Sequence, residues 1–277
     1  MVDPDDPGRI IAFMAILAHW TDVGGRYVGS SASNDTTDIF QEGIQFRSIK
    51  LRRGGRRVEE TYRCIEYNTR FPVMVLGDLD AQLAGCLKGA SLYQDLARKF
   101  SASTLESGVH QLWRRAEAAA RQAVRAIPDG VYRASAFLDN DGIALDKPIE
   151  CPITVRVEGE RFIVDFSEIS PQVRGPFNSG RDGGGITCAR IAFKYLTTPE
   201  ESTNEGSFAP LEVILPDGKF LSASATAPMA RYSAPLSTVV DTIIRTMENG
   251  APRMIAAGHH ASMGSHRFQG QHPRTGQ

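Results

Sequence analysis

The sequence has few cysteines, almost no net charge and no long apolar run. Its four cysteines include no CxxC pair, which disfavours both a zinc knuckle and a disulfide framework. The 31 basic residues nearly balance the 32 acidic ones, so nothing marks the whole chain as a polyanion binder. The apolar run from Ile10 to Ala18 is far shorter than the roughly 20 residues that span a bilayer. We therefore expect a cytoplasmic protein with buried, free thiols in a reducing compartment, and one that binds neither nucleic acid nor membrane.

Motifs for nucleotide binding and for serine hydrolysis are also missing. The chain contains neither GxxxxGK[ST] nor a GxGxxG that follows a strand. It lacks GxSxG as well, and the nearest stretch, "GSHRFQG", has the wrong spacing for a nucleophile elbow. One basic cluster surrounds Gly54-Gly55, and we interpret it as a solvated hairpin tip because no nucleic-acid recognition module accompanies it.

Apolar spacing predicts two consecutive helices in the first half of the chain. The first begins at Asp78 as N-cap and continues to Phe100 with a period near 3.6 residues. The second opens with a capping box at Ser103 and Glu106 and runs until Pro128. Because the intervening turn is short, we expect an antiparallel helical hairpin.

After the hairpin the pattern changes to a period of two. "VYRASAFLD", "ITVRVEGERFIVDFS" and "LEVILPDGKFL" predict strands, and helices are predicted for "GGGITCARIAFKYLTT" and for "STVVDTIIRTMENG", which Ser237 would cap. The fold class is therefore α+β, with mixed or antiparallel sheets, packed helices and a helical hairpin insertion. We divide the chain into a β-rich N-terminal segment, 1–77, the hairpin, 78–128, and an α/β segment, 129–277.

The N-terminal segment carries the first candidate site, in "AHWTDVGG". We predict Ile10 to Ala18 as a buried strand that ends at His19. An imidazole at His19 and a carboxylate at Asp22 can converge on a divalent metal, because Gly24 and Gly25 let the backbone turn away. Spacing alone favours the alternative, a histidine satisfied by a hydrogen bond to a neighbouring loop.

Two further segments are rich in glycine. Four of the six histidines (His259, His260, His266 and His272) lie in the tail, where they suit metal or anion contact, acid–base chemistry, or simply a polar, mobile end. Gly183, Gly184 and Gly185 open a predicted helix, so their N–H groups suit a carboxylate or phosphate, or the glycines permit close packing. The residues leave these alternatives open.

Four stretches in order resemble one family across nearly the whole chain: "AHWTDVGGRYVGS", "VDFSEISPQVRGPFNSG", "TNEGSFAPLEVILPDGKFL" and "VVDTIIRTM…GHHASMG". They resemble the hydantoinase B/oxoprolinase family, which includes the large subunits of acetone and acetophenone carboxylases. The resemblance implies a cytoplasmic, ATP-dependent assembly in which a hydantoinase A-type partner binds ATP. It also implies a divalent metal of the Mn, Zn or Fe type. Lactams, hydantoins, 5-oxoproline and ketones are the family's substrates.

The resemblance assigns roles to individual residues. His19 matches a metal ligand of the family, and Asp22 is carried over as a catalytic residue that orients the site. His259 and His260 are catalytic candidates, expected with His266 to face the same cleft. Gly183 to Gly185 are the cofactor-binding candidates, on the ground of the glycine-rich helix entry and not of the resemblance. Two family ligands in an HxxD arrangement precede this motif, and the sequence lacks them, so we expect an internal fragment with an incomplete metal site.

The functional hypothesis is a metal-bearing subunit, or a piece of one, of an ATP-dependent cyclic amide hydrolase of the hydantoinase/5-oxoprolinase type. In that chemistry the partner phosphorylates a carbonyl oxygen, and a metal-oriented water attacks. Two alternatives stay open. One is a subunit of an ATP-dependent ketone carboxylase, and the other is a truncated, non-catalytic remnant that keeps only a subunit-binding surface.

Overall fold

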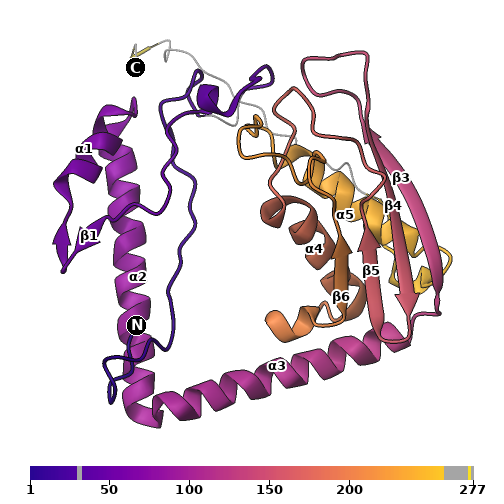
Figure 1. Cartoon of the computed structure of the whole chain (residues 1–277), viewed down its shortest axis with the longest axis horizontal. Helices are drawn as coiled ribbons and strands as arrows, with labels where there is room; N and C mark the ends of the chain where they lie inside the picture. The colour runs from indigo at the N-terminus through magenta and orange to yellow at the C-terminus, as the bar shows by residue number, and fades with distance from the viewer. Residues whose placement is uncertain (30–32, 259–273, 276–277) are drawn as a thin grey trace.

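The computed structural model describes residues 1–29, 33–258 and 274–275, and it contains two separate hydrophobic cores (Figure 1). The smaller core belongs to the N-terminal lobe and the larger one to a lobe built on a four-stranded sheet. The helix α3 (Ala102–Arg125) connects the lobes. The predicted α+β class with mixed sheets and packed helices is confirmed.

The N-terminal lobe is built around α1 (Glu59–Tyr67) and α2 (Pro72–Phe100). Its core is small, because it is formed by four buried side chains: Tyr62, Ile65, Val75 and Leu79. A 3₁₀ turn, Ile39–Glu42, lies on the chain before α1, where extended pieces were expected. The described part of 1–77 contains only two strands of two residues each, so the expected β-rich character is wrong; the division of the chain at 77 and 128 stays a prediction.

The predicted hairpin tip is confirmed. Strand β1 (Arg52–Arg53) pairs antiparallel with β2 (Arg56–Arg57). The turn requires glycine, since Gly54 and Gly55 have φ angles of 55° and 77°. The guanidinium of Arg57 stacks 3.6 Å from the ring centre of Tyr62, so this cation covers the edge of the lobe's own core.

Both predicted helices exist, but they begin elsewhere and do not form an antiparallel hairpin. Helix α2 starts at Pro72, a residue that suits the first turn because its missing N–H has no helical partner there. Helix α3 is capped by Ser101, whose Oγ accepts a hydrogen bond from the N–H of Thr104 at 3.2 Å. Ser101 has a φ of 65°, and α3 leads away from the end of α2 toward the sheet instead of doubling back (Figure 1).

The second lobe contains the sheet of β3 (Gly130–Leu138), β4 (Ile149–Glu158), β5 (Arg161–Asp165) and β6 (Leu211–Ile214), in that spatial order. The first two pairs are antiparallel and the last is parallel. The tight β4–β5 turn uses Gly159 with a φ of 63°.

One face of this sheet is buried under α4 (Thr187–Thr197) and α5 (Ala234–Thr246). Alternate residues of β4 are therefore fully buried, as a one-sided sheet requires, while the other face carries ion pairs such as Arg156–Asp165. Helix α5 begins before the predicted cap Ser237. Shorter turns complete the lobe, a π-helical turn and two 3₁₀ turns: Asp182–Ile186, Glu205–Phe208 and Pro252–Met254.

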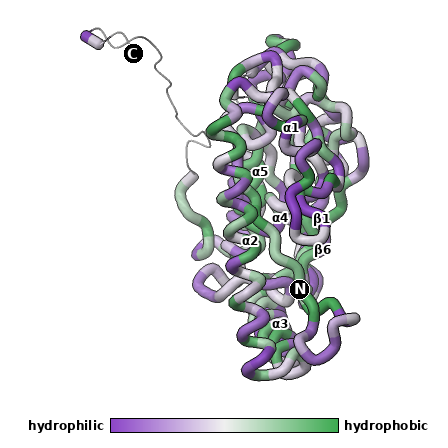
Figure 2. The backbone as a smooth tube through the Cα atoms, turned by 90° about the vertical axis from the view of Figure 1, so that its left-hand side faces the viewer, coloured by the Kyte–Doolittle hydropathy of each residue, from purple (hydrophilic) through white to green (hydrophobic). Residues whose placement is uncertain are grey.

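The prediction of a buried strand from Ile10 to Ala18 is wrong. This segment runs beside α2 without joining a sheet, apart from an isolated bridge between Ile10 and Val2 (Figure 1). Leu17 is 97% exposed. Apolar residues (green) are interspersed with polar ones along α2 in Figure 2. The segment approaches α2 closely at glycines of this helix. A Cβ on Gly85 would lie 2.5 Å from the Ile16 side chain.

The four cysteines are free, as predicted. Cys151 and Cys188 are buried in the sheet lobe, and burial raises the pKa of each thiol to about 12. Cys64 is exposed, so its predicted burial is wrong. Among the described residues, no helix is both long and apolar enough to cross a membrane.

Candidate functional site

Asp22 is the most firmly held candidate of the "AHWTDVGG" motif, because its side chain is 1% exposed and both of its carboxylate oxygens accept hydrogen bonds. Its Oδ1 accepts a hydrogen bond from Nη1 of Arg70 at 2.6 Å. Its Oδ2 accepts from the backbone N–H of Arg70 at 2.7 Å, from the Thr69 hydroxyl at 3.2 Å and from the N–H of Gly24 at 3.4 Å. Burial alone would raise the pKa of Asp22, but these donors and the Arg70 charge outweigh it and lower the pKa.

The two glycines after Asp22 fit a narrow space. Gly24 has a φ of 75°, and a Cβ there would lie 2.3 Å from the carbonyl oxygen of Asn68. A Cβ on Gly25 would lie 2.7 Å from the backbone of Glu42. The motif therefore needs two residues without side chains because its loop is pressed between the start of α2 and the Ile39–Glu42 turn.

His19 lies on the solvent side of this arrangement. Its neighbour Trp20 is half-buried and donates a hydrogen bond from Nε1 to Oε1 of Gln82 on α2 at 2.8 Å. His19 itself is exposed. The alternative of a histidine satisfied by a neighbouring loop has no support among the described contacts, and the ring is accessible to a ligand or to another polypeptide.

The described residues do not assemble a metal site. Within residues 1–29, 33–258 and 274–275, no group of three or more histidine, cysteine, aspartate or glutamate side chains could hold an ion. Both oxygens of Asp22 are already occupied by protein donors, so Asp22 is not free to bind a metal beside His19. This part of the chain therefore offers one candidate ligand, His19, and does not fit a complete centre.

The glycine-rich entry to α4 is closely packed at two of its three positions. A Cβ on Gly184 would lie 2.2 Å from Oγ of Ser179, and one on Gly185 would lie 2.7 Å from the Leu215 side chain. The N–H groups of both glycines already donate to backbone carbonyls. Only Gly183 faces open space. Close packing accounts for Gly184 and Gly185.

An apolar cavity of about 430 Å³ adjoins the motif, between the segment before His19, the stretch before α1 and α2. Its polar side-chain groups come from Ser48, Gln82, the Cys86 thiol and the indole N–H of Trp20. The remaining lining is aliphatic or aromatic: Ile16, Trp20, Phe46, Ile49, Leu51, Ile65, Leu79 and Leu83. This cavity suits apolar groups, and no acidic, basic or histidine side chain lines it.

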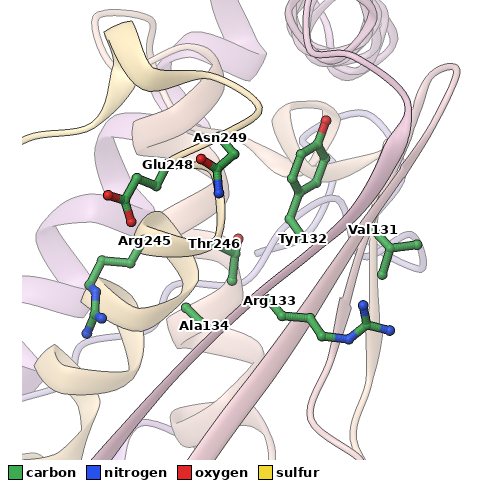
Figure 3. Close-up of a pocket in the computed structure, with 8 residues that line it drawn as sticks. All are labelled: Val131, Tyr132, Arg133, Ala134, Arg245, Thr246, Glu248 and Asn249. Carbon is green, nitrogen blue, oxygen red and sulfur yellow. The ribbon is translucent and has the colours of Figure 1, made fainter.

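A second cavity, of about 310 Å³, lies between β3 and the end of α5 in the sheet lobe (Figure 3). It includes none of the site residues predicted from the sequence. The Arg133 and Arg245 side chains that line it point away from each other in Figure 3. The two arginine side chains therefore do not converge on a common binding point in this cavity.

Two functional positions escaped the sequence analysis. Arg70 holds Asp22, although 48 positions separate them. Glu42 joins the two lobes, because its carboxylate accepts a hydrogen bond from the backbone N–H of Met229. The only local signal near Arg70 is the Pro72 that opens α2. The tail candidates His259 and His260, with His266 and His272, lie outside the described residues.

Comparison with known proteins identifies close parallels. A family model described as hydantoinase B/oxoprolinase matches residues 2–277. The beta subunit of caprolactamase from Pseudomonas jessenii is 29% identical over 262 residues, which cover 92% of this chain and 44% of that subunit. The delta subunit of acetophenone carboxylase from Aromatoleum aromaticum is 24% identical over 245 residues, covering 88% of this chain and 35% of that subunit.

A solved structure agrees with the sequence matches. The crystal structure of the ATP-dependent caprolactamase from Pseudomonas jessenii superposes with a TM-score of 0.76 at 26% identity. The similarity covers 86% of this chain and 41% of that one. The chain thus spans less than half the length of these relatives.

Proposed function

The chain belongs to the hydantoinase B/oxoprolinase family, and we propose that it serves as a B-type subunit, or part of one, in an ATP-dependent cyclic amide hydrolase. The observation that carries this proposal is the family match over residues 2–277, within which the "AHWTDVGG" loop is folded against α2. Caprolactamase acts on caprolactam, which is a cyclic amide. The match to its beta subunit therefore supports the choice of lactam substrates.

In this proposal the chain works with a partner. The two relatives are a beta subunit and a delta subunit, which supports assembly with at least one other polypeptide. We assign ATP binding to a hydantoinase A-type partner, because this sequence has no P-loop. The assembly would be cytoplasmic.

His19 is the group that this chain would contribute to the reaction centre. Its exposed imidazole is suited to donate a lone pair to a divalent metal of the Mn, Zn or Fe type, which would polarise a carbonyl or lower the pKa of a water molecule. The described residues do not complete a metal site around this imidazole. Asp22 would act indirectly, by holding the loop that follows His19.

Ring opening coupled to ATP cleavage tests the proposal. The chain is co-purified with a hydantoinase A-type subunit and incubated with ATP and ε-caprolactam, 5-oxoproline or a hydantoin, while ADP and the ring-opened acid are quantified. The proposal predicts that both products form in proportion for at least one substrate and that omission of either polypeptide abolishes them. Absence of ring opening with all three classes, in an assembly that forms, would contradict it.

A second function has its own support. The similarity to the delta subunit of acetophenone carboxylase favours carboxylation of a ketone, in which an enolate replaces water as the nucleophile. The same assembly supplied with acetone or acetophenone, ATP and labelled bicarbonate would then incorporate label into a carboxylate. A non-catalytic, subunit-binding piece is the third candidate, because the described residues hold no group of three or more histidine, cysteine, aspartate or glutamate side chains that could bind a metal.

A further inference from the structure

One arginine connects both ends of the loop that follows His19. Nη1 of Arg70 donates to Oδ1 of Asp22 at 2.6 Å, while Nη2 of the same guanidinium donates to the carbonyl oxygen of Gly25. The backbone N–H of Arg70 also donates to Asp22, so one residue supplies three of the loop's hydrogen bonds. The stretch Asp22 to Gly25 is thereby closed into a ring through a side chain.

The planar fork of arginine is what this contact needs. Two N–H groups fixed in one plane reach a carboxylate and a carbonyl at the same time, whereas a lysine ammonium is a single point charge on a flexible stem. Arg70 is itself 41% exposed on its other side, while Asp22 is 1% exposed. The pair therefore lies at the edge of the lobe, with the carboxylate inside and the guanidinium covering it.

The other side of the loop is fixed independently. The N–H of Arg26 donates to the carbonyl of Gln41 at 2.7 Å, and the N–H of Ile44 donates to the carbonyl of Val23 at 2.9 Å. Upstream, Trp20 is bound to Gln82 of α2. His19 thus immediately precedes an anchored residue, and only Thr21 separates that anchor from Asp22.

We propose that Arg70 is a positioning residue for His19: by bridging Asp22 and the Gly25 carbonyl it fixes the loop that sets the direction of the exposed imidazole. This inference rests on the proposed function, because that function is what gives His19 a role in the reaction. Arg70 does not touch the reacting groups in this account, and its effect is transmitted through Asp22 and the backbone.

The test compares four variants of the whole chain. Arg70→Lys keeps the charge beside Asp22 but cannot make both contacts, and Arg70→Met removes both. The double variant Asp22→Asn/Arg70→Met removes the buried charge together with its partner, so that stability and positioning are separated. Arg63→Met, at an exposed position of α1, is the matched control.

Two measurements are made on the free protein. They are the hydrogen exchange rate of the Gly24 amide, which donates to Asp22, and the position and width of the His19 imidazole signal, identified by its loss in His19→Gln. We expect exchange to become about tenfold faster or more in both Arg70 single variants, and the His19 signal to shift or broaden. The double variant should regain the unfolding midpoint lost by Arg70→Met yet keep the altered His19 signal. Arg63→Met should match the wild type.

The outcomes separate the inference from the proposed function. A wild-type His19 signal and wild-type amide exchange in Arg70→Lys would overturn the positioning role. Recovery of the His19 signal together with stability in the double variant would also overturn it, because Arg70 would then serve folding alone. Absence of ring opening by the wild-type assembly bears on the proposed function, whereas the exchange and imidazole measurements still decide the role of Arg70.

Discussion

Oε1 of Glu42 accepts a hydrogen bond from the backbone N–H of Met229 at 2.7 Å, across 187 positions of the sequence. The same oxygen accepts from the N–H of Ala230 at 2.9 Å and from the hydroxyl of Thr36 at 3.1 Å. Glu42 belongs to the turn that also presses on Gly25 of the motif loop. The Glu42 carboxylate therefore joins the Ile39–Glu42 turn, which lies against Gly25, to the sheet lobe.

The Glu42 contact predicts a specific pH dependence. Burial raises the pKa of Glu42 above its ordinary value of 4.5, outweighing the donors Ala230, Met229 and Thr36, and the nearby Asp38 charge raises it further. The folded protein therefore holds this proton more tightly than the unfolded chain, so the stabilisation is complete below pH 4.5 and is lost as pH rises through the folded pKa. We expect Glu42→Gln, which keeps an acceptor oxygen, to gain stability relative to wild type as pH rises above 4.5.

Urea unfolding from pH 4 to pH 8 measures this difference. Glu42→Ala is the comparison, because it leaves the N–H groups of Met229 and Ala230 without their acceptor and should be about 1–3 kcal/mol less stable than Glu42→Gln at every pH. A Gln-minus-wild-type difference that stays constant with pH would show that Glu42 does not titrate differently on folding.

Gly184 and Gly183 offer a matched pair for the glycine-rich helix entry. Gly184→Ala should destabilise by about 1–3 kcal/mol, because its Cβ would meet Ser179 Oγ at 2.2 Å and the Leu221 carbonyl oxygen at 2.8 Å. Gly183→Ala meets no atom within 4 Å and should leave the free energy of unfolding within about 0.5 kcal/mol of wild type or raise it. Chemical denaturation of both variants checks this, and equal costs would contradict the close-packing explanation.

Two leucines of the N-terminal lobe test the correction made to the first segment. Leu79 is 4% exposed and belongs to the small core, so Leu79→Ala should cost about 2–5 kcal/mol. Leu17 is 97% exposed, and Leu17→Ala should change the free energy of unfolding by no more than about 0.5 kcal/mol. Thermal or urea unfolding of the isolated chain distinguishes them. A large cost at Leu17 would restore the buried strand predicted from the sequence.

The cysteines should divide into two reactivity classes. Burial raises the pKa of Cys151 and Cys188 to about 12, so neither forms a thiolate at pH 8. Exposed Cys64 should react first with a thiol reagent in the native protein, followed more slowly by half-buried Cys86. Mass mapping of the labelled residues should find Cys151 and Cys188 modified only after denaturation. Their modification in the folded state at the rate of Cys64 would contradict the packing described here.

The sheet lobe was predictable because its strands and helices bury faces of their own. Alternation in β3 and β4 locates the strands, and Gly159 marks their turn with β5. In each of these elements the spacing of the apolar residues corresponds to a face that other elements of this chain bury. Helix ends were less accurate, since Asp78 and Ser103 looked like caps, whereas α2 begins at Pro72 and Ser101 caps α3.

The N-terminal segment could not be predicted in the same way. An apolar run such as Ile10 to Ala18 has the composition of a buried strand, but composition does not show whether the chain contains the surface that would cover it. The direction of α3 depends on Ser101, whose φ of 65° is not expected of serine.

The candidate site was predictable only in part. The sequence indicated His19 and Asp22 from their spacing and the two glycines, and the glycine requirement is explained by the contacts of Gly24 and Gly25. Arg70 could not be found, because the hydrogen bond that matters joins positions 48 apart. The same loop that brings His19 to the surface uses Asp22 internally, which spacing alone does not reveal.

The rate of ATP-dependent ring opening with and without the His19 imidazole tests the central claim most directly. The assembly with a hydantoinase A-type subunit would be assayed on ε-caprolactam, 5-oxoproline and a hydantoin, with the wild-type chain and with His19→Ala. We predict an active wild type and a variant slower by about 10²-fold or more, with the unfolding midpoint unchanged because the ring is exposed. A His19→Ala assembly that opens the ring at the wild-type rate would contradict the account.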